Sequence, residues 1–314
     1  MAAALALARR AAGQTGSNPN VGCLVVQQGR VAGRGWTAAG GRPHAEAMAL
    51  AEAGDAASGA TAYVTLEPCA HISPRGPDCA GALVAAGIAR AVVAMTDPDP
   101  RTAGAGIARL EAAGIAVTHG AGAPGATAEL AGFSRRMRGG RAELVLKLAL
   151  SLDGRLALAG GQSRWITGAV ARAYAHRLRS MADLVLVGGG TLRHDAPRLD
   201  VRLPGHAGAQ PLRAILSRAP VPAPFIALPS LDALDALPGV NRILCEGGPG
   251  LATALLAADR VDRLILLRAP ILLGDGPGLE GLGLHDLAAA HGRWRLEDRR
   301  ALGADQLEQF RRNR

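Results

Sequence analysis

Aromatic residues are scarce in this chain: Phe, Trp and Tyr make up 3% of its 314 residues, while 49% are hydrophobic. That hydrophobic content excludes a disordered or fibrous protein, and the cores must consist mostly of Ala, Leu, Val and Ile. No apolar run reaches the roughly 18 residues that a membrane-spanning helix needs. The apolar start carries its basic pair, Arg9 and Arg10, after the run, the reverse of a secretory signal. We therefore expect a cytoplasmic protein that begins with a helix.

Cysteine is also rare, with four residues in the chain. Disulfides need an oxidising compartment, and nothing in the sequence points to one. Cys23 and Cys245 lie in apolar runs and are expected in the core, whereas Cys69 and Cys79 suit metal ligation.

Lysine is almost absent, because Lys147 is the single lysine among 35 basic side chains. It is either a chance survivor or a site that needs a compact ammonium instead of a guanidinium. The formal net charge of +9 could indicate a polyanionic partner. The basic residues are scattered without a block of five or more, however, so small phosphorylated molecules are the favoured partners and nucleic acid is not expected.

Helix and strand patterns alternate along both halves, which predicts an α/β fold with largely parallel or mixed sheets. A polar, glycine-containing stretch at residues 135–141 predicts the domain boundary, giving domains 1–142 and 143–314. Helices are expected at residues 2–13, 44–53, 80–86, 106–113, 126–133 and 168–180. Strands are expected at residues 21–26, 61–66, 91–95, 115–118, 144–150, 184–187, 212–216, 242–245 and 263–267.

Metal-ligand chemistry is concentrated in His44, Cys69 and Cys79, with the carboxylate of Glu46 two residues after the histidine. One imidazole and two thiolates with an open fourth position are typical of a catalytic zinc site. His-x-Glu followed by Pro-Cys and a second cysteine is the signature of zinc nucleobase deaminases, with Glu as the proton shuttle. A structural zinc site with His71 as fourth ligand is the minor alternative, and a zinc-stabilised binding module is a third reading.

These motifs resemble the deaminase half of the bifunctional riboflavin-biosynthesis deaminase/reductase family, in which the two cysteines are also far apart. The matching segments are residues 18–23, 43–46 and 63–71, with Cys79. The resemblance implies a cytidine-deaminase-like three-layer domain followed by a shortened dihydrofolate-reductase-like α/β domain. It implies riboflavin biosynthesis from 2,5-diamino-6-ribosylamino-4-pyrimidinone 5′-phosphate: zinc hydroxide replaces the ring amine with oxygen, and NADPH then reduces ribosyl to ribityl.

By this resemblance His44, Cys69 and Cys79 hold Zn²⁺ and Glu46 moves protons. The substrate contacts expected in this half are Asn18, Arg75 and Asp97, with Arg75 near the phosphate. A plain turn before Pro98 explains Asp97 almost as well.

The second half shows only weak signals of its own, such as the glycine run 188–190 after a strand. The family resemblance continues through residues 147–155, 163–167, 191–202 and 246–248. It implies catalytic roles for Asp195 and Lys147, the role of the lysine being open. It implies cofactor binding by Ala149, Trp165, Thr191, Asp195, Gly248, Pro249 and Gly250, and substrate binding by Ser163, Arg179, Leu199, Arg202 and Glu246. Core packing for Trp165 and a solvated helix face for Arg179 are the alternatives.

Several features depart from the family pattern. The loop between the cysteines is one residue longer, Thr37 stands where a histidine is common, and Ala196 replaces a polar residue. The chain between residues 216 and 246 is much shorter than usual, so at least one strand–helix unit of the reductase domain is missing or compressed. Either the pared-down reductase works, or this half is catalytically silent and the chain is a deaminase only. A tRNA or other nucleic-acid deaminase is the further alternative, and the family resemblance suggests a homo-oligomer, a dimer or tetramer.

Overall fold

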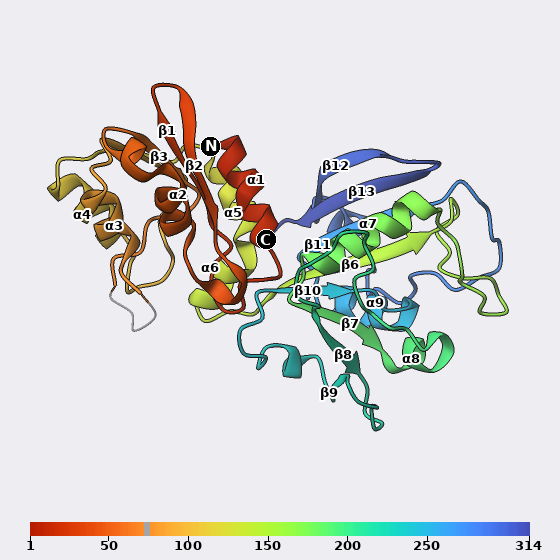
Figure 1. The fold of residues 1–314 in the computed structure, drawn as a ribbon. Coiled ribbons are helices and arrows are strands. Elements are labelled where there is room, and N and C mark those ends of the chain that lie inside the picture. The colour runs from red at the N-terminus through yellow and green to blue at the C-terminus, as the bar shows by residue number, and fades with distance from the viewer. Residues whose placement is uncertain (72–75) are drawn as a thin grey trace. The chain divides into compact units, whose positions relative to one another are not determined.

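The computed structural model describes residues 1–71 and 76–314, so Arg75, a predicted phosphate contact, lies outside the described residues. The chain forms two compact units, Met1–Arg141 and Ala142–Arg314, shown in Figure 1. Within the described part no helix is long and apolar enough to cross a membrane.

The first unit is built on a mixed five-stranded sheet of order β2-β1-β3-β4-β5, with β3, β4 and β5 parallel and β1 antiparallel to both of its neighbours. Its strands are β1 (Gly22–Gln27), β2 (Arg30–Trp36), β3 (Thr61–Val64), β4 (Arg90–Val93) and β5 (Ala116–His119). Its helices are α1 (Ala2–Ala11), α2 (Ala45–Ala53), α3 (Cys79–Ala85), α4 (Ala105–Ala112), α5 (Ala123–Glu129) and α6 (Ala131–Met137), with 3₁₀ turns at Ala39–Gly41 and Gly54–Ala57.

Helices cover both faces of this sheet, which makes three layers. Cys23 and Val25 of β1 point into a core that includes Ala45 and Ala49 of α2, whereas Leu24 points to the opposite face and packs with α1. The alternation follows from the two-residue period of a strand. The expected three-layer arrangement is therefore confirmed.

Glycines let the helices lie directly on the sheet. A Cβ at Gly35 of β2 would lie 1.9 Å from the carbonyl oxygen of Ala45, and one at Gly22 would lie 2.0 Å from that of Ala4. The first contact fixes the start of α2, where His44 and Glu46 stand.

The second unit holds an eight-stranded sheet of order β12-β13-β11-β6-β10-β7-β8-β9, parallel from β11 to β9. The strands are β6 (Glu143–Leu150), β7 (Leu184–Gly188), β8 (Leu212–Leu216), β9 (Ile226–Leu228), β10 (Arg242–Cys245), β11 (Arg263–Arg268), β12 (Trp294–Leu302) and β13 (Asp305–Arg312). The helices are α7 (Ala169–Ser180), α8 (Gly189–Asp195), α9 (Pro249–Ala257) and α10 (Leu287–Ala290), with a 3₁₀ turn at Asp232–Leu234.

The two faces of this sheet are covered by different helices. Val145 of β6 packs with Ala171 and Ala175 of α7, whereas Leu146 packs with Leu255 of α9 on the other face. Strand β10 returns late in the chain and inserts between β6 and β7. The carboxyl ends of β7 and β10 are therefore neighbours, and a reversal of strand order of this kind is where open α/β sheets bind ligands.

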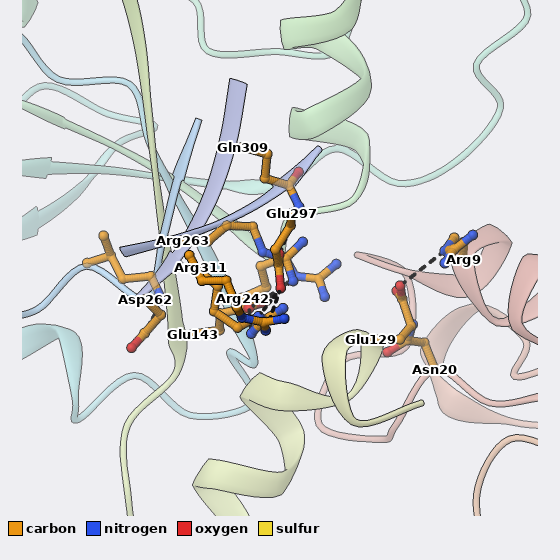
Figure 2. A network of polar contacts seen from close by, with 12 residues as sticks. Arg9, Asn20, Glu129, Glu143, Arg242, Asp262, Arg263, Glu297, Gln309 and Arg311 are labelled. Carbon is orange, nitrogen blue, oxygen red and sulfur yellow. Dashed lines mark hydrogen bonds and ion pairs between the residues drawn. The ribbon is translucent and has the colours of Figure 1, made fainter. Parts of the chain in front are cut away.

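A buried carboxylate lies at the other end of the parallel strands, where β6 begins. Glu143, the first residue of β6, is fully buried and pairs with Arg242 at 2.9 Å, Arg263 at 3.3 Å and Arg311 at 3.7 Å. Figure 2 shows these guanidinium groups converging on it, with Glu297 as a second acceptor for Arg311. These cations lower the pKa of Glu143 against the opposing effect of burial.

Most expected helices and strands are present, with ends displaced by at most two residues, but several elements were not predicted. Strand β2 and the β12–β13 hairpin carry too many exposed or glycine residues to show a buried period, and α8 and α9 follow glycine turns that were interpreted as loops. The single helix expected at residues 126–133 is two helices, α5 and α6. Between β8 and β10 the structure has the three-residue β9 and one 3₁₀ turn. That this segment is compressed relative to the family stays a prediction.

Candidate active sites

The three predicted zinc ligands come together in the first unit. One ligand atom from each of His44, Cys69 and Cys79 lies within 4.8 Å of the others. His44 precedes α2, Cys79 begins α3, and Cys69 follows β3 through a short loop. The Nδ1 atom of His44 is 3.2 Å from the sulfur of Cys79 and 3.6 Å from that of Cys69.

This donor set fits zinc. One imidazole nitrogen and two sulfurs suit a borderline-soft ion, and three protein ligands leave one tetrahedral position open. A hydrogen bond from the Cys79 thiol lowers the pKa of Cys69 despite burial, so one thiolate forms readily. His71, the candidate fourth ligand, instead places its Nδ1 atom 3.2 Å from the hydroxyl of Thr102. Among the described residues, therefore, the only metal-ligating group is the three-ligand one.

Glu46 lies beside the ligands in the first turn of α2 and is 3% exposed. Burial raises the pKa of this carboxyl, and the charge of Cys69 adds to the effect, while His44 opposes both. A carboxyl group with a raised pKa both accepts and returns a proton near neutral pH, as a general acid–base residue must.

Glu67, which lies immediately before Pro68 and Cys69, was not predicted from the sequence as a functional residue. Its side chain is buried, and its carboxylate accepts hydrogen bonds from four backbone N–H groups, those of Asp97, Gly104, Gly106 and Ile107. A glutamate inside a buried stretch without a lysine or arginine nearby in sequence was the available signal, since buried carboxylates need partners.

The expected substrate residues of this unit have different surroundings. Asp97 is 7% exposed, and its Oδ1 atom accepts a hydrogen bond from the N–H of Asp99. Burial raises the pKa of Asp97 to about 7, with the carboxylates of Asp99 and Glu67 adding to the effect. The side chain of Asn18 lies against Gly41, where a Cβ would be 2.0 Å from the Asn18 nitrogen. Thr37 bridges the carbonyl of Pro19 and the N–H of Val21 instead of facing a ligand.

In the second unit Lys147, Arg179 and Glu246 form one cluster. Arg179 grips the Glu246 carboxylate with two hydrogen bonds of 2.5 and 3.1 Å, and the Lys147 ammonium lies 3.2 Å from it. Burial disfavours the charged carboxylate, but Lys147 and Arg179 outweigh this and lower the pKa of Glu246 to about 2. The three side chains meet on the α7 face of the sheet, near the carboxyl ends of β6 and β10.

Residues 198–202 lie next to this cluster, because the remaining guanidinium nitrogen of Arg179, Nη1, donates to the carbonyl of Asp200 at 2.9 Å. The Asp200 carboxylate pairs with both Arg198 and Arg202. Leu199 is 1% exposed in a core cluster, so its side chain is not available to a substrate and only its backbone could contribute.

The predicted cofactor residues lie where glycine turns enter helices. Gly248 precedes α9, and its N–H donates to the hydroxyl of Thr191 on α8 at 3.2 Å, which joins the starts of the two helices. Pro249 and Gly250 begin α9. Ala149 follows Lys147 by two residues in β6, so the two side chains lie on the same face of that strand.

Asp195 and Trp165 lie at the surface near this region. Asp195 ends α8 and pairs with Arg164 at 3.6 Å, and Arg164 also donates to its carbonyl. Trp165 is 66% exposed, so the core-packing alternative is wrong, and Arg172 stacks on its ring at 5.1 Å. Ser163 is half-buried two residues earlier.

Comparison with known proteins defines the class. A family model for the cytidine and deoxycytidylate deaminase zinc-binding region matches residues 1–95, and one for the RibD C-terminal domain matches residues 142–225 and 227–306. The chain is thus a zinc-dependent deaminase joined to a reductase.

The relatives give the family. The riboflavin biosynthesis protein RibD of Escherichia coli (strain K12) is 39% identical over 355 aligned residues, covering 97% of this chain and 96% of the relative. The structure of Acinetobacter baumannii RibD (form 1) is 35% identical with a TM-score of 0.88, covering 100% of this chain and 98% of that one. A deaminase/reductase structure from Thermotoga maritima is 28% identical with a TM-score of 0.89, covering 100% and 97%. The chain belongs to the RibD family of bifunctional riboflavin-biosynthesis enzymes, whose cofactors are zinc and NADPH.

Proposed function

We propose that the first unit deaminates 2,5-diamino-6-ribosylamino-4-pyrimidinone 5′-phosphate and that the second unit reduces the ribosyl group of the product. The convergence of His44, Cys69 and Cys79 beside the buried Glu46 carries the proposal for the first step. The substrate assignment is supported by the Thermotoga maritima relative, described as a diaminohydroxyphosphoribosylaminopyrimidine deaminase/5-amino-6-(5-phosphoribosylamino)uracil reductase.

For the deamination, His44, Cys69 and Cys79 would hold a zinc ion, which would lower the pKa of a bound water to about 7. Glu46 would move two protons in turn: one from the attacking water to the ring nitrogen, and then the proton of the newly added hydroxyl group to the departing amine. Water is consumed, ammonia leaves, and the ring carbon C2 exchanges its C–N bond for a carbonyl. Asp97 and Asn18 hold the substrate at the site.

For the reduction, NADPH bound to this unit would supply the hydride that C1′ of the opened sugar requires. Lys147 uses one of its three N–H donors on Glu246, so the others can stabilise the developing charge or donate a proton to the nitrogen that takes up the electron pair. Arg179 and Arg202 suit the substrate phosphate because guanidinium groups make forked, charge-assisted hydrogen bonds. Thr191 and residues 248–250 hold the cofactor phosphates, while Asp195, Ala149 and Trp165 line the nicotinamide side.

We propose that the compressed second unit is an active reductase. The segment that we expect to be shortened lies at the β8–β9 edge of the sheet, whereas the Lys147 cluster and the glycine turns after β7 and β10 lie away from that edge. A deaminase with a silent second half is the alternative.

The proposed partner is a small phosphorylated pyrimidine, with no nucleic acid, for a homo-oligomeric enzyme in the cytoplasm. Exposed leucines such as Leu272 and Leu287, 74% and 75% exposed, are available for subunit contacts. Sedimentation of the purified protein measures the oligomeric state, and a monomer would contradict that part of the proposal.

The test is a coupled assay on zinc-loaded protein with the diaminopyrimidinone ribosyl phosphate, in which ammonia release and NADPH oxidation are followed separately. Ammonia release followed by NADPH oxidation would support two working sites. Ammonia without NADPH oxidation would leave a deaminase with a silent partner unit. Without ammonia, the substrate assignment is wrong, and salt-dependent RNA binding would then be measured.

A further inference from the structure

Glu67 immediately precedes the Pro68-Cys69 pair, and its carboxylate accepts hydrogen bonds from two parts of the chain, the loop that carries Asp97 and the start of α4. Its Oε2 atom accepts from the N–H groups of Asp97 and Gly104, each at 3.0 Å. Its Oε1 atom accepts from Gly106 at 2.9 Å and Ile107 at 3.2 Å. All four donors are backbone groups 30 to 40 residues along the chain.

The second pair of donors belongs to the first turn of α4. Helix α4 begins after Gly104, which has no side chain to cap it, so the Glu67 carboxylate takes that role from outside the helix. The two segments also touch directly: a Cβ at Gly106 would lie 2.0 Å from the carbonyl oxygen of Pro68. The start of α4 is therefore held against the residue that precedes the zinc ligand Cys69.

The other donors belong to the loop that carries Asp97. The backbone N–H of Glu67 donates to the carbonyl of Met95 at 2.9 Å, while its side chain accepts from the N–H of Asp97. Residue 67 thus grips this loop on both sides of Thr96. The Asp97 carboxyl is in turn oriented by the N–H of Asp99 at 2.9 Å.

We propose that Glu67 is a positioning residue of the deaminase, which fixes the Asp97 carboxyl relative to Cys69 and thereby the substrate relative to the metal ligands. The inference rests on the proposed function, because Asp97 is the substrate contact through which Glu67 acts. The carboxylate of Glu67 is engaged by backbone N–H groups, so Glu67 would act through Asp97 and not directly on the substrate.

The experiment is a double-mutant cycle on the zinc-loaded full chain, made of Glu67→Gln, Asp97→Asn and the double variant. Glutamine keeps the size of Glu67 but turns an amide NH₂ toward two of the four N–H donors, so the Asp97 loop or α4 must move. The matched control is Glu111→Gln, the same change at an exposed position of α4. Ammonia release gives kcat and KM, metal analysis gives zinc content, and NADPH oxidation on the deaminated substrate reports the second unit.

The expected result is a KM at least tenfold higher for Glu67→Gln, a smaller change in kcat, unchanged zinc content and unchanged reductase activity. The double variant should be no worse than Asp97→Asn alone within about twofold, since both changes remove the same contact. Multiplicative losses in the double variant, or a wild-type KM in Glu67→Gln, would overturn the proposal.

Gly106→Ala keeps Glu67 but forces α4 away from Pro68, and it should raise KM in the same non-additive way if Glu67→Gln does not fold. Insoluble protein from both variants would assign Glu67 to folding alone and refute its positioning role. A wild-type chain that releases no ammonia would instead contradict the proposed function. An active wild type with an unchanged KM in Glu67→Gln would contradict the positioning role alone.

Discussion

Glu46 and Asp97 show how position changes the chemistry of a single carboxyl group. Both are buried near the same cysteine ligand, and burial raises the pKa of each. Glu46 has an imidazole and two sulfurs as neighbours, whereas Asp97 has other carboxylates around it. The first is suited to moving protons, and the second is suited to a substrate contact whose strength depends on pH.

Replacing Glu46 by glutamine should lower kcat for ammonia release by about 10²–10⁴-fold, because the proton shuttle is removed. Zinc content should remain at the wild-type level, since Glu46 is not among the proposed ligands His44, Cys69 and Cys79. Metal analysis and initial rates check this, with Glu52→Gln on the outer side of α2 as the control. Normal turnover by Glu46→Gln would contradict the assigned role.

The stability of the zinc-free chain should fall as pH rises from 3.8 to about 7 because of Asp97. In that window the unfolded chain has released this proton while the folded chain retains it, so the unfolded state binds fewer protons and stability decreases. The Asp97→Asn variant should lack this decrease of stability with pH. Urea midpoints across the window, with exposed Asp55→Asn as the control, measure it; parallel curves for wild type and Asp97→Asn would refute it.

At the scale of elements, close contacts decide where the functional side chains stand. Helix α2 lies on β2 because Gly33 and Gly35 leave room for the backbone of Ala49 and Ala45. In the second unit the start of β6 is held by three arginines around Glu143. Each arrangement yields a prediction for one element.

Gly35→Ala should destabilise the first unit by about 1–3 kcal/mol or more, because the new methyl group must displace the α2 backbone. Deamination should fall further than reduction, since α2 carries Glu46 and follows His44. Thermal unfolding and both activities test this. Gly160→Ala, with nothing within 4 Å of the added Cβ, is the matched control and should be neutral.

Glu143→Gln should destabilise the second unit by about 3–5 kcal/mol, because a fully buried partner of several guanidinium groups loses its charge. The loss should appear in the denaturant midpoint. Glu280→Gln, at an exposed position, should leave that midpoint unchanged. A change of less than about 0.5 kcal/mol in the free energy of unfolding of Glu143→Gln would show that the ion cluster contributes little net stability.

At the scale of the whole molecule, the chain carries two compact units with separate polar centres, one for each activity of the family. The metal ligands and Glu46 all come from residues below 80, and the Lys147 cluster comes from residues above 146. Damage to one centre should therefore leave the other intact.

Asp195→Asn should impair NADPH oxidation and leave ammonia release within about twofold of wild type. The reason is that Asp195 ends α8 of the second unit and pairs there with Arg164. The two rates are measured on one protein sample, with Asp286→Asn at an exposed position of the same unit as the control. Equal loss of both rates would argue against separable centres.

The sequence by itself determined the class of fold, the family and the zinc ligand set, because these depend on local periodicity and on residue types at short spacings. His44 with Glu46, and Cys69 with Cys79, each lie within one or two neighbouring elements. The roles of the remaining predicted residues stay predictions.

Only the tertiary structure decided which distant groups meet. Glu67 finds its partners 30 to 40 residues away and Glu246 finds Lys147 on another strand, contacts that no periodicity encodes. The β12–β13 hairpin also escaped prediction, since its strands expose both faces in part and show no buried alternation. Partners of buried charge are chosen by which strands and helices become neighbours, and that choice is made by the packing of the whole unit.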